Sequence, residues 1–360
     1  MPAESDEIDC ERCGETLERG DAYSLDGYEY CAGCHDDVQD ENYQNEDEDR
    51  QTEGVHSYGY KPQAMFFNSD GRASRSSAKI VEDNGIVHGE PYMGMEIEVE
   101  DPSGRHDHDA IVQTILSHTN GLVYVKEDCS LSNGFEIVTH PMTIGYLQNH
   151  SDGLRSALSH LRTRGFRAWQ TSTCGLHIHI SKNSFKDAKH EMKFLYFVYM
   201  NKENMVKFSG RNSGYAKYDI DAFVGASGMD WDDKDKPTIM EVVKGVRKNG
   251  EYVPSAYERN LAVNRNNSHT HELRLFRPSL RFETVLAYGE FVHCLWEFTQ
   301  VVTSGQAIKE KGLREFEMFA NYAREHNELY PNLVKKIHKR GVSPMPLGWL
   351  TEDNKESDGK

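Results

Sequence analysis

The sequence lacks any apolar run that approaches the roughly twenty residues needed to span a membrane as a helix. Its first residues, MPAESDE, contain neither the basic nor the apolar segment of a secretory signal peptide. It also has no GxxxxGK(S/T) motif, which excludes a P-loop as the means of holding a nucleotide phosphate. We therefore expect a soluble, intracellular protein that is not a P-loop enzyme.

Hydrophobic residues are scarce for a compact protein of 360 residues, at 37%. The net charge is −17, and the acidic run Asp36–Glu53 has little to bury, so we expect part of the chain to stay unpacked. Nucleic acid is not expected as a partner on this evidence, since phosphate binding requires clustered Lys and Arg. The basic stretch at 71–79 is short and lacks interleaved aromatic residues, so we interpret it as an exposed loop.

Cysteine is also uncommon, but four of the seven cysteines form two CxxC pairs near the N-terminus. Each pair can hold one side of a tetrahedral Zn²⁺ ion, and no βαβ pattern surrounds them that would indicate a redox site. We predict a zinc ribbon or knuckle, with two redox pairs or unliganded thiols as the alternative. The predicted ligands of this structural Zn²⁺ are Cys10, Cys13, Cys31 and Cys34.

The segment TCGLHIHIS at 173–181 alternates polar and apolar residues. In a strand, His177 and His179 would lie on one face, and Ile178 and Ile180 on the other. One face would then be available for chemistry and the other for packing.

Two further stretches carry charged residues on one strand face. They are GMEIEVE, with Glu96, Glu98 and Glu100, and HELRLF, with Glu272 and Arg274. Because burying unpaired carboxylates costs far more than burying leucines gains, these acids predict a bound cation. Carboxylate oxygens with an imidazole suit Mg²⁺ or Mn²⁺ better than Zn²⁺.

A loop could bring a third pair of acids to the same place, because Asp128 precedes Glu136 by eight residues in DCSLSNGFEIV. The alternative for all these acids is a set of half-exposed edge strands with solvated carboxylates. His177 could instead be a buried structural histidine, and Arg274 could form a salt bridge to a neighbouring acid. Cys174, beside two histidines, could be a thiol nucleophile, although proximity in sequence does not create a Cys–His pair.

The remaining pattern mixes strands and helices without regular βαβ alternation, which predicts an α+β fold. The expected helices are at 109–118, 144–164, 183–208, 282–303 and 309–326, and a polar excursion is expected at 219–256. We divide the chain into a zinc module (1–40), an acidic and Ser/Arg-rich linker (41–88), a catalytic domain (89–350) and a disordered tail (351–360).

Taken in order, the motifs GxExE, DxSx₅E, CGLHIHIS and ELR resemble those of the amidoligase family. The resemblance covers residues 58–330 and includes YKPQAMF at 60–66. This family is a branch of the carboxylate–amine ligases that share the catalytic fold of glutamine synthetase and glutamate–cysteine ligase. The resemblance implies an antiparallel sheet lined with metal-binding acids, with helices packed on its other face.

The same resemblance implies at least two divalent ions, Mg²⁺ or Mn²⁺, beside the phosphates of ATP. Carried over by position, the residues implied for one ion are Glu98, Glu136 and Asp128, and those for the other are Glu96, His177 and Glu272. Arg274 would contact the transferred phosphoryl group, and Arg211 would contact phosphate or a substrate carboxylate. Residues implied to line the site are His179, Asn264 and Arg277.

The implied reaction uses ATP to phosphorylate a carboxylate, after which an amine attacks the acyl phosphate to give an amide, ADP and phosphate. The substrates would be amino acids, peptides or a protein in the cytoplasm of a bacterial or phage-infected cell, and the zinc module would bind a protein partner. One alternative is a metal-dependent hydrolase or nuclease that activates water with the same acids. Another is an interaction protein with an inactive ligase-like domain. Only a ligase must consume ATP.

Overall fold

The computed structural model describes most of the sequence from residue 54 onward. The described residues are 54–75, 90–219, 260–302 and 316–343, with short segments at 7–9, 16–18, 22–25, 28–31, 81–83, 86–88, 247–248 and 251–252. Cys10, Cys13 and Cys34 of the predicted zinc module, the acidic run and the predicted tail therefore lie outside the described residues. Cys31 directly follows β4 and is partly buried.

A six-stranded antiparallel sheet is the centre of the described structure, in the order β10-β11-β9-β12-β16-β15. Its strands are β9 (Met93–Glu100), β10 (Val123–Lys126), β11 (Gly134–Thr139), β12 (Leu176–Ser181), β15 (Val263–Asn264) and β16 (Thr270–Phe276). The predicted α+β class is confirmed, because helices and an antiparallel sheet occur together without parallel βαβ units in the described ranges.

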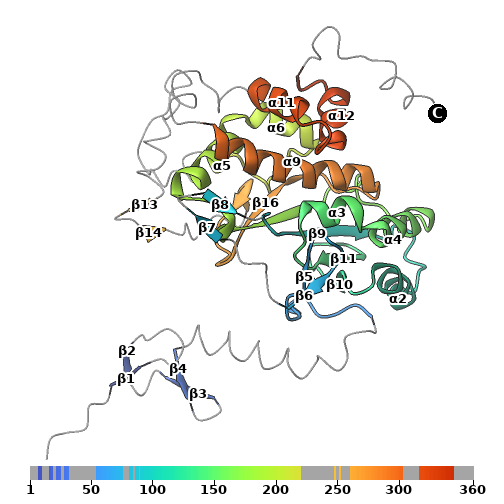
Figure 1. Ribbon diagram of the computed structural model, residues 1–360. Coiled ribbons are helices and arrows are strands. Elements are labelled where there is room, and N and C mark those ends of the chain that lie inside the picture. Colours follow the sequence, from blue (N-terminus) through green and yellow to red (C-terminus); the bar gives the residue numbers. More distant parts are fainter. Residues whose placement is uncertain are drawn as a thin grey trace, which may run out of the picture.

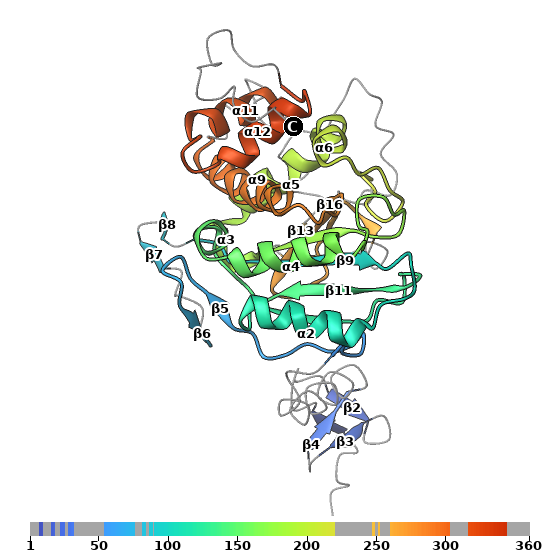
Figure 2. The ribbon, with the colours of Figure 1, turned by 90° about the vertical axis from the view of Figure 1, so that its right-hand side faces the viewer.

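Helices pack over one face of this sheet (Figures 1 and 2). They are α2 (His108–Thr119), α3 (Ile144–Asn149), α4 (Asp152–Thr163), α5 (Ala188–Met200), α6 (Lys202–Ser209), α9 (Phe282–Val301), α11 (Phe316–Glu325) and α12 (Pro331–Lys339). The contact between sheet and helix is close at Gly289 of α9, where a Cβ would lie 3.1 Å from Met95 Cε and 2.6 Å from Leu147 Cδ2. Both methyl groups belong to the single hydrophobic core.

Smaller antiparallel pairs lie outside the main sheet. They are β1 (Glu7–Asp9) with β2 (Thr16–Glu18), β3 (Tyr23–Leu25) with β4 (Tyr28–Tyr30), β5 (Phe66–Phe67) with β6 (Ala73–Ser74), β7 (Val81–Asp83) with β8 (Ile86–His88), and β13 (Arg247–Lys248) with β14 (Glu251–Tyr252). The stretch at 71–79 is thus not simply a loop, since β6 lies within it. None of the helices in the described ranges is long and apolar enough to cross a membrane.

Two predicted helices are each divided. The expected helix at 144–164 is interrupted between α3 and α4, and the one at 183–208 is a 3₁₀ turn (Lys182–Ser184) followed by α5 and α6. The second interruption falls at Asn201, whose side-chain amide donates to the Phe197 carbonyl and so occupies an acceptor of the α5 backbone. The polar excursion predicted at 219–256 lies almost wholly outside the described residues.

Candidate active site

The face of the sheet opposite the helices carries the predicted polar side chains. Along β9, Met95, Ile97 and Val99 are fully buried in the core, and the alternate residues Glu96 and Glu98 line a cavity of about 950 Å³. The same alternation on β12 and β16 places histidines and Glu272 in that cavity. Other described residues that line it include Lys61, Lys126, Asp128, Glu136, His177, His179, Arg211, Asn264 and Arg274.

The strand register brings the acids and histidines into direct cross-strand pairs. Glu98 lies opposite Glu136, and Glu96 lies opposite His177. Glu272 lies between two strands, opposite His179 on one side and Asn264 on the other. The acids and histidines in these pairs are therefore up to 176 positions apart in sequence, from Glu96 to Glu272.

Among the residues that the structure describes, three groups of ligand atoms lie close enough together to hold a metal ion, with all atoms of a group within 4.8 Å of one another. One group contains Glu98, Asp128 and Glu136, the same three residues that the family resemblance implies for one ion. The others are Glu96 with His179 and Glu272, and Glu96 with Glu136 and His177.

The second implied set differs from the geometry in its histidine. The resemblance places His177 with Glu96 and Glu272, whereas the group whose ligand atoms all lie within 4.8 Å of one another joins these two acids with His179. His177 lies between the two groups, because its Nδ1 is 3.0 Å from Glu96 Oε2 and 3.5 Å from Glu272 Oε1, and its Nε2 is 3.8 Å from Glu98 Oε1.

Electrostatics in the cavity divide the four glutamates into two pairs. Burial raises the pKa of Glu136 to about 9, and the neighbouring charge of Glu96 adds to this rise. Burial likewise raises the pKa of Glu98. Burial also acts on Glu96 and Glu272, but the nearby histidines outweigh it and lower the pKa of each carboxyl. The positive charges beside Glu98 and Glu136, such as Lys126, therefore do not outweigh burial, as the histidines do for Glu96 and Glu272.

The chemistry of these donors fits a hard divalent cation. The sets are mainly carboxylate oxygen, which Mg²⁺ and Mn²⁺ prefer. The buried Nε2 atoms of His177 and His179 make no hydrogen bond within the described residues, although His179 Nε2 lies 3.2 Å from Glu96 Oε1. On the other ring nitrogen, His179 Nδ1 lies 3.1 Å from Thr270 Oγ1, which fixes the ring orientation.

Lys126 is a residue of this site that sequence reasoning missed. It lies opposite Glu136 in the register, and its Nζ is 3.1 Å from Glu136 Oε2. Although burial lowers the pKa of Lys126, the charges of Glu136 and Glu96 raise it above its ordinary value. The only signal in the sequence is its position at the end of the strand VYVK, which is equally typical of a solvated surface lysine.

Two arginines face the same cavity. Arg274 on β16 bonds to Glu272 through Nη1 and donates from Nε to the Tyr215 carbonyl at 3.3 Å. Arg211, which follows α6, donates from Nη1 to the Arg274 carbonyl at 2.8 Å. The ion pair that sequence reasoning offered as the alternative for Arg274 is therefore present, and the arginine also lines the cavity.

Arg277 is the one implied site residue that the described structure keeps out of the cavity. It follows β16, and its Nε donates to the Trp169 carbonyl at 2.8 Å while its guanidinium lies 4.7 Å from the centre of the Trp169 ring.

Cys174 is buried, and burial raises the pKa of its thiol to about 12. A neutral thiol is a poor nucleophile, which argues against the Cys–His alternative.

Comparison with known proteins found a similarity that covers the part of the site on strands β9 to β12. Residues 38–213 match the model of a family described as "Putative amidoligase enzyme". The motifs on β9, β11 and β12 thus lie within a range that is similar to this family, whose description names a ligase-type enzyme. A search among curated proteins found no match. The matched range ends before β15 and β16, so Asn264, Glu272 and Arg274 lie beyond it.

Proposed function

We propose that this chain is an ATP-dependent carboxylate–amine ligase that acts through an acyl phosphate. The observation that carries the proposal is the arrangement on one sheet face of carboxylate-rich ligand groups, with two arginines beside them. Phosphoryl transfer needs this combination, because it depends on positioning and on neutralising the phosphate oxygens.

In this proposal Glu98, Asp128 and Glu136 hold one Mg²⁺ or Mn²⁺ ion, and Glu96, His179 and Glu272 hold another. When bound, the ions neutralise the phosphates of ATP and so make the terminal phosphorus accessible to a carboxylate. His177 lies between the two groups and orients Glu96 through its Nδ1.

The arginines have separate tasks. Arg274 faces the cavity from β16 and would bind the oxygens of the phosphoryl group as it passes to the substrate carboxylate. Arg211 would hold Arg274 in place through the backbone of β16, because its guanidinium donates to the carbonyls of Arg274 and Phe276. The base of the cavity, where Glu98 and Glu136 are buried, would keep water from the acyl phosphate, which water otherwise hydrolyses before the amine attacks.

The test is ATP binding and ADP formation by the purified protein with Mg²⁺ or Mn²⁺ and pooled amino acids and amines. Wild type would be compared with Glu98→Gln and Glu272→Gln, and with the exposed Glu127→Gln as the matched control. We expect metal-dependent binding that both site variants lose and the control retains. Failure to bind ATP with either metal would refute the proposal. Hydrolysis of an ester or phosphodiester without ATP would instead support a hydrolase that uses the same acids.

We further propose that the cysteine pairs at 10–34 hold a structural Zn²⁺ and that this module brings a protein substrate to the ligase. A truncated protein tests this role. It should retain the residues from Gly54 onward, because the backbone of His56 forms hydrogen bonds with the backbone of Val125 and Glu127 at β10. Removal of residues 1–50 should leave ATP turnover with small substrates intact and abolish modification of the protein target. Equal loss of both activities would contradict this role.

A further inference from the structure

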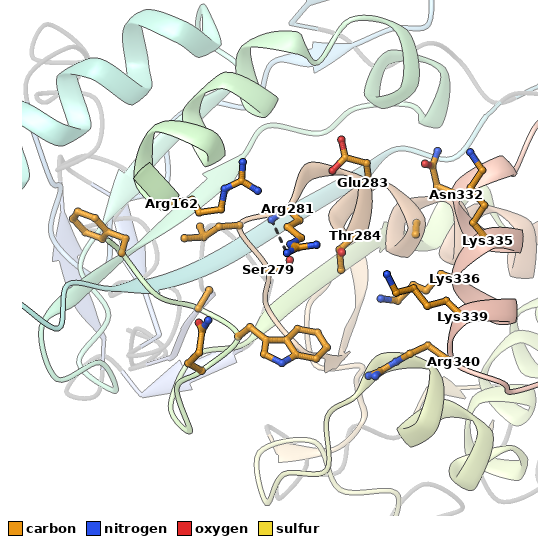
Figure 3. A pocket seen from close by; sticks show the side chains of 16 residues that line it. Arg162, Ser279, Arg281, Glu283, Thr284, Asn332, Lys335, Lys336, Lys339 and Arg340 are labelled. Atoms are coloured by element: carbon orange, nitrogen blue, oxygen red, sulfur yellow. Dashed lines mark hydrogen bonds between the residues drawn. The ribbon is translucent and has the colours of Figure 1, made fainter. Parts of the chain in front are cut away.

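A second cavity, of about 740 Å³, lies at the ends of α4, α9 and α12 (Figure 3). Its walls are the C-terminal end of α4, the segment 166–170, the turn from β16 into α9, and one side of α12. It shares no lining residue with the acidic cavity.

Positive side chains dominate this second cavity. They come from separate elements, and in Figure 3 the side chains of Lys336, Lys339 and Arg340 extend toward Arg281 across the hollow. The basic residues that line it are Arg162, Arg281, Lys335, Lys336, Lys339 and Arg340. Glu283 is the one acid in the lining, and it forms an ion pair with Arg155, which is not part of the lining.

None of these six cations forms a salt bridge in the described ranges, in a protein whose net charge is −17. Cations at the end of a helix stabilise its dipole, and this accounts for Lys339 and Arg340 on α12. The helix dipole does not account for Arg281, which lies just before the start of α9. Nor does it explain why Arg162, Arg281 and the cations of α12 all line one cavity.

Lys336 shows how strongly the positive charges act on one another. Its Nζ lies 4.2 Å from the centre of the Tyr288 ring, partly out of water. Burial, together with the charges of Arg340 and Lys339, lowers its pKa to about 7. An anion bound in the cavity would offset these charges and favour the protonated amine of Lys336.

We infer that this basic cavity binds a compact ligand that carries two or more phosphate groups. Arginine and lysine together are the usual phosphate ligands, and the volume suits a small molecule. A single-stranded nucleic acid would require a groove with aromatic platforms. Here the cations surround one hollow, and the Trp169 ring is already engaged by Arg277 and Arg340, at 4.7 and 5.4 Å.

The first experiment is isothermal titration of the full-length protein with tripolyphosphate in EDTA and about 0.15 M salt, where surface charges are screened. Without metal the acidic cavity repels phosphate, so binding reports on the basic cavity independently of ligase activity. Arg281→Gln and Lys339→Gln should each weaken binding about tenfold, the cost of one charge-assisted hydrogen bond. Both side chains are exposed, so the variants should fold.

Controls separate this site from general attraction of anions. Lys189→Gln and Arg105→Gln remove equal charge from exposed positions outside the cavity and should leave binding unchanged. No binding of tripolyphosphate, or equal weakening by the controls, would overturn the inference. Binding of citrate as tight as that of tripolyphosphate would overturn the assignment to phosphate.

Proton uptake gives a second readout. Near pH 7, binding of the anion should protonate Lys336, so the measured heat should depend on the ionisation enthalpy of the buffer. Lys336→Gln should remove that dependence. The charged groups that share the cavity with Lys336 are Arg162 of α4, Arg281 and Glu283 at α9, and Lys335, Lys339 and Arg340 of α12. Loss of ATP turnover in Arg281→Gln would show that the two cavities form one site, contrary to the inference.

Discussion

Glu136 and Glu98 lie directly opposite each other on β11 and β9, two buried carboxyl groups whose pKa values are both raised. Among the lysines and arginines of the described structure, Lys126 is the one that forms a salt bridge to either glutamate. When both carboxyl groups are ionised, their negative charges repel each other and destabilise the folded protein. A divalent cation bound between them would relieve this repulsion.

Substitution Glu136→Gln should separate metal binding from folding. We expect Mn²⁺ at about 100 times its Kd to raise the Tm of wild type by about 5 °C, since such a ligand adds about 2.7 kcal/mol to stability. The variant should lose this rise, whereas its stability without metal reflects two opposed effects, the relief of repulsion with Glu98 and the loss of the ion pair with Lys126. Thermal unfolding with EDTA and with Mn²⁺ measures both. Loss of the rise in Glu127→Gln as well would contradict the assignment.

The conservative substitution Arg274→Lys distinguishes phosphate binding from a structural ion pair. Lysine can keep the pair with Glu272 but cannot supply the planar fork that holds two phosphoryl oxygens. We expect kcat to fall about 100-fold with little change in the KM for ATP. Steady-state ADP formation tests this, with exposed Arg105→Lys as the control. A kcat near that of wild type would show that Arg274 only forms the salt bridge to Glu272 and does not bind the phosphoryl group.

Gly175→Ala should displace Arg211. A Cβ at Gly175 would lie 2.4 Å from Arg211 Nη1 and 2.6 Å from His177 Nε2, both closer than van der Waals contact allows. Turnover should fall about 100-fold, the usual cost of misplacing a catalytic group by about 1 Å. Gly214→Ala is the matched control, because it lies in the loop after Arg211 and a Cβ there meets nothing within 4 Å. Similar rates for the two variants would disprove the positioning role.

Buried neutral histidines should make the protein unstable in mild acid. Burial lowers the pKa of His190 to about 4 and that of His293 to about 3, below the ordinary value near 6.5. At these two positions the unfolded chain therefore binds more protons below pH 6.5, so the stability that the neutral histidines contribute is complete above pH 6.5 and is lost as the pH drops toward 4. His190 has no room for a second ring proton, because Nε2 is 2.7 Å from the Trp296 carbonyl and Nδ1 accepts from the Lys186 N–H.

Denaturant unfolding at pH 7.0, 5.5 and 4.5 measures this fall. His190→Gln should flatten it by an amount on the order of 3 kcal/mol, because glutamine keeps both hydrogen bonds and does not titrate. Exposed His338→Gln should retain the wild-type slope. An unchanged slope in His190→Gln would refute the role of this histidine.

The sequence was sufficient to identify the acidic face, because alternation along β9, β12 and β16 determines which side chains share a side. It could not choose between His177 and His179, which lie on the same face two residues apart. That choice depends on β16, which pairs with β12 through a register shift between Leu176 and Ile178. Lys126 was missed for a related reason, since only the register places it against Glu136.

The family resemblance implied Arg277 as a residue that lines the site, and it lies three positions after Arg274 in sequence. The strand ends at Phe276, and the next residue turns toward Trp169. The basic cavity was not foreseen at all, because its cations are distributed from Arg162 to Arg340 and become neighbours only when α4, α9 and α12 pack together. No short stretch of the sequence indicates either the turn at Arg277 or the grouping of these cations.

The pairing of β12 with both β9 and β16 also has a consequence for protein synthesis. Until the ribosome has released residue 276, the strand with both histidines has no partner on one side, and its N–H and C=O groups are open to another polypeptide. A fragment that stops at residue 213, where the family match ends, would keep that open edge permanently. Such a fragment should form aggregates through β12, whereas co-expression with the missing C-terminal segment should keep it soluble.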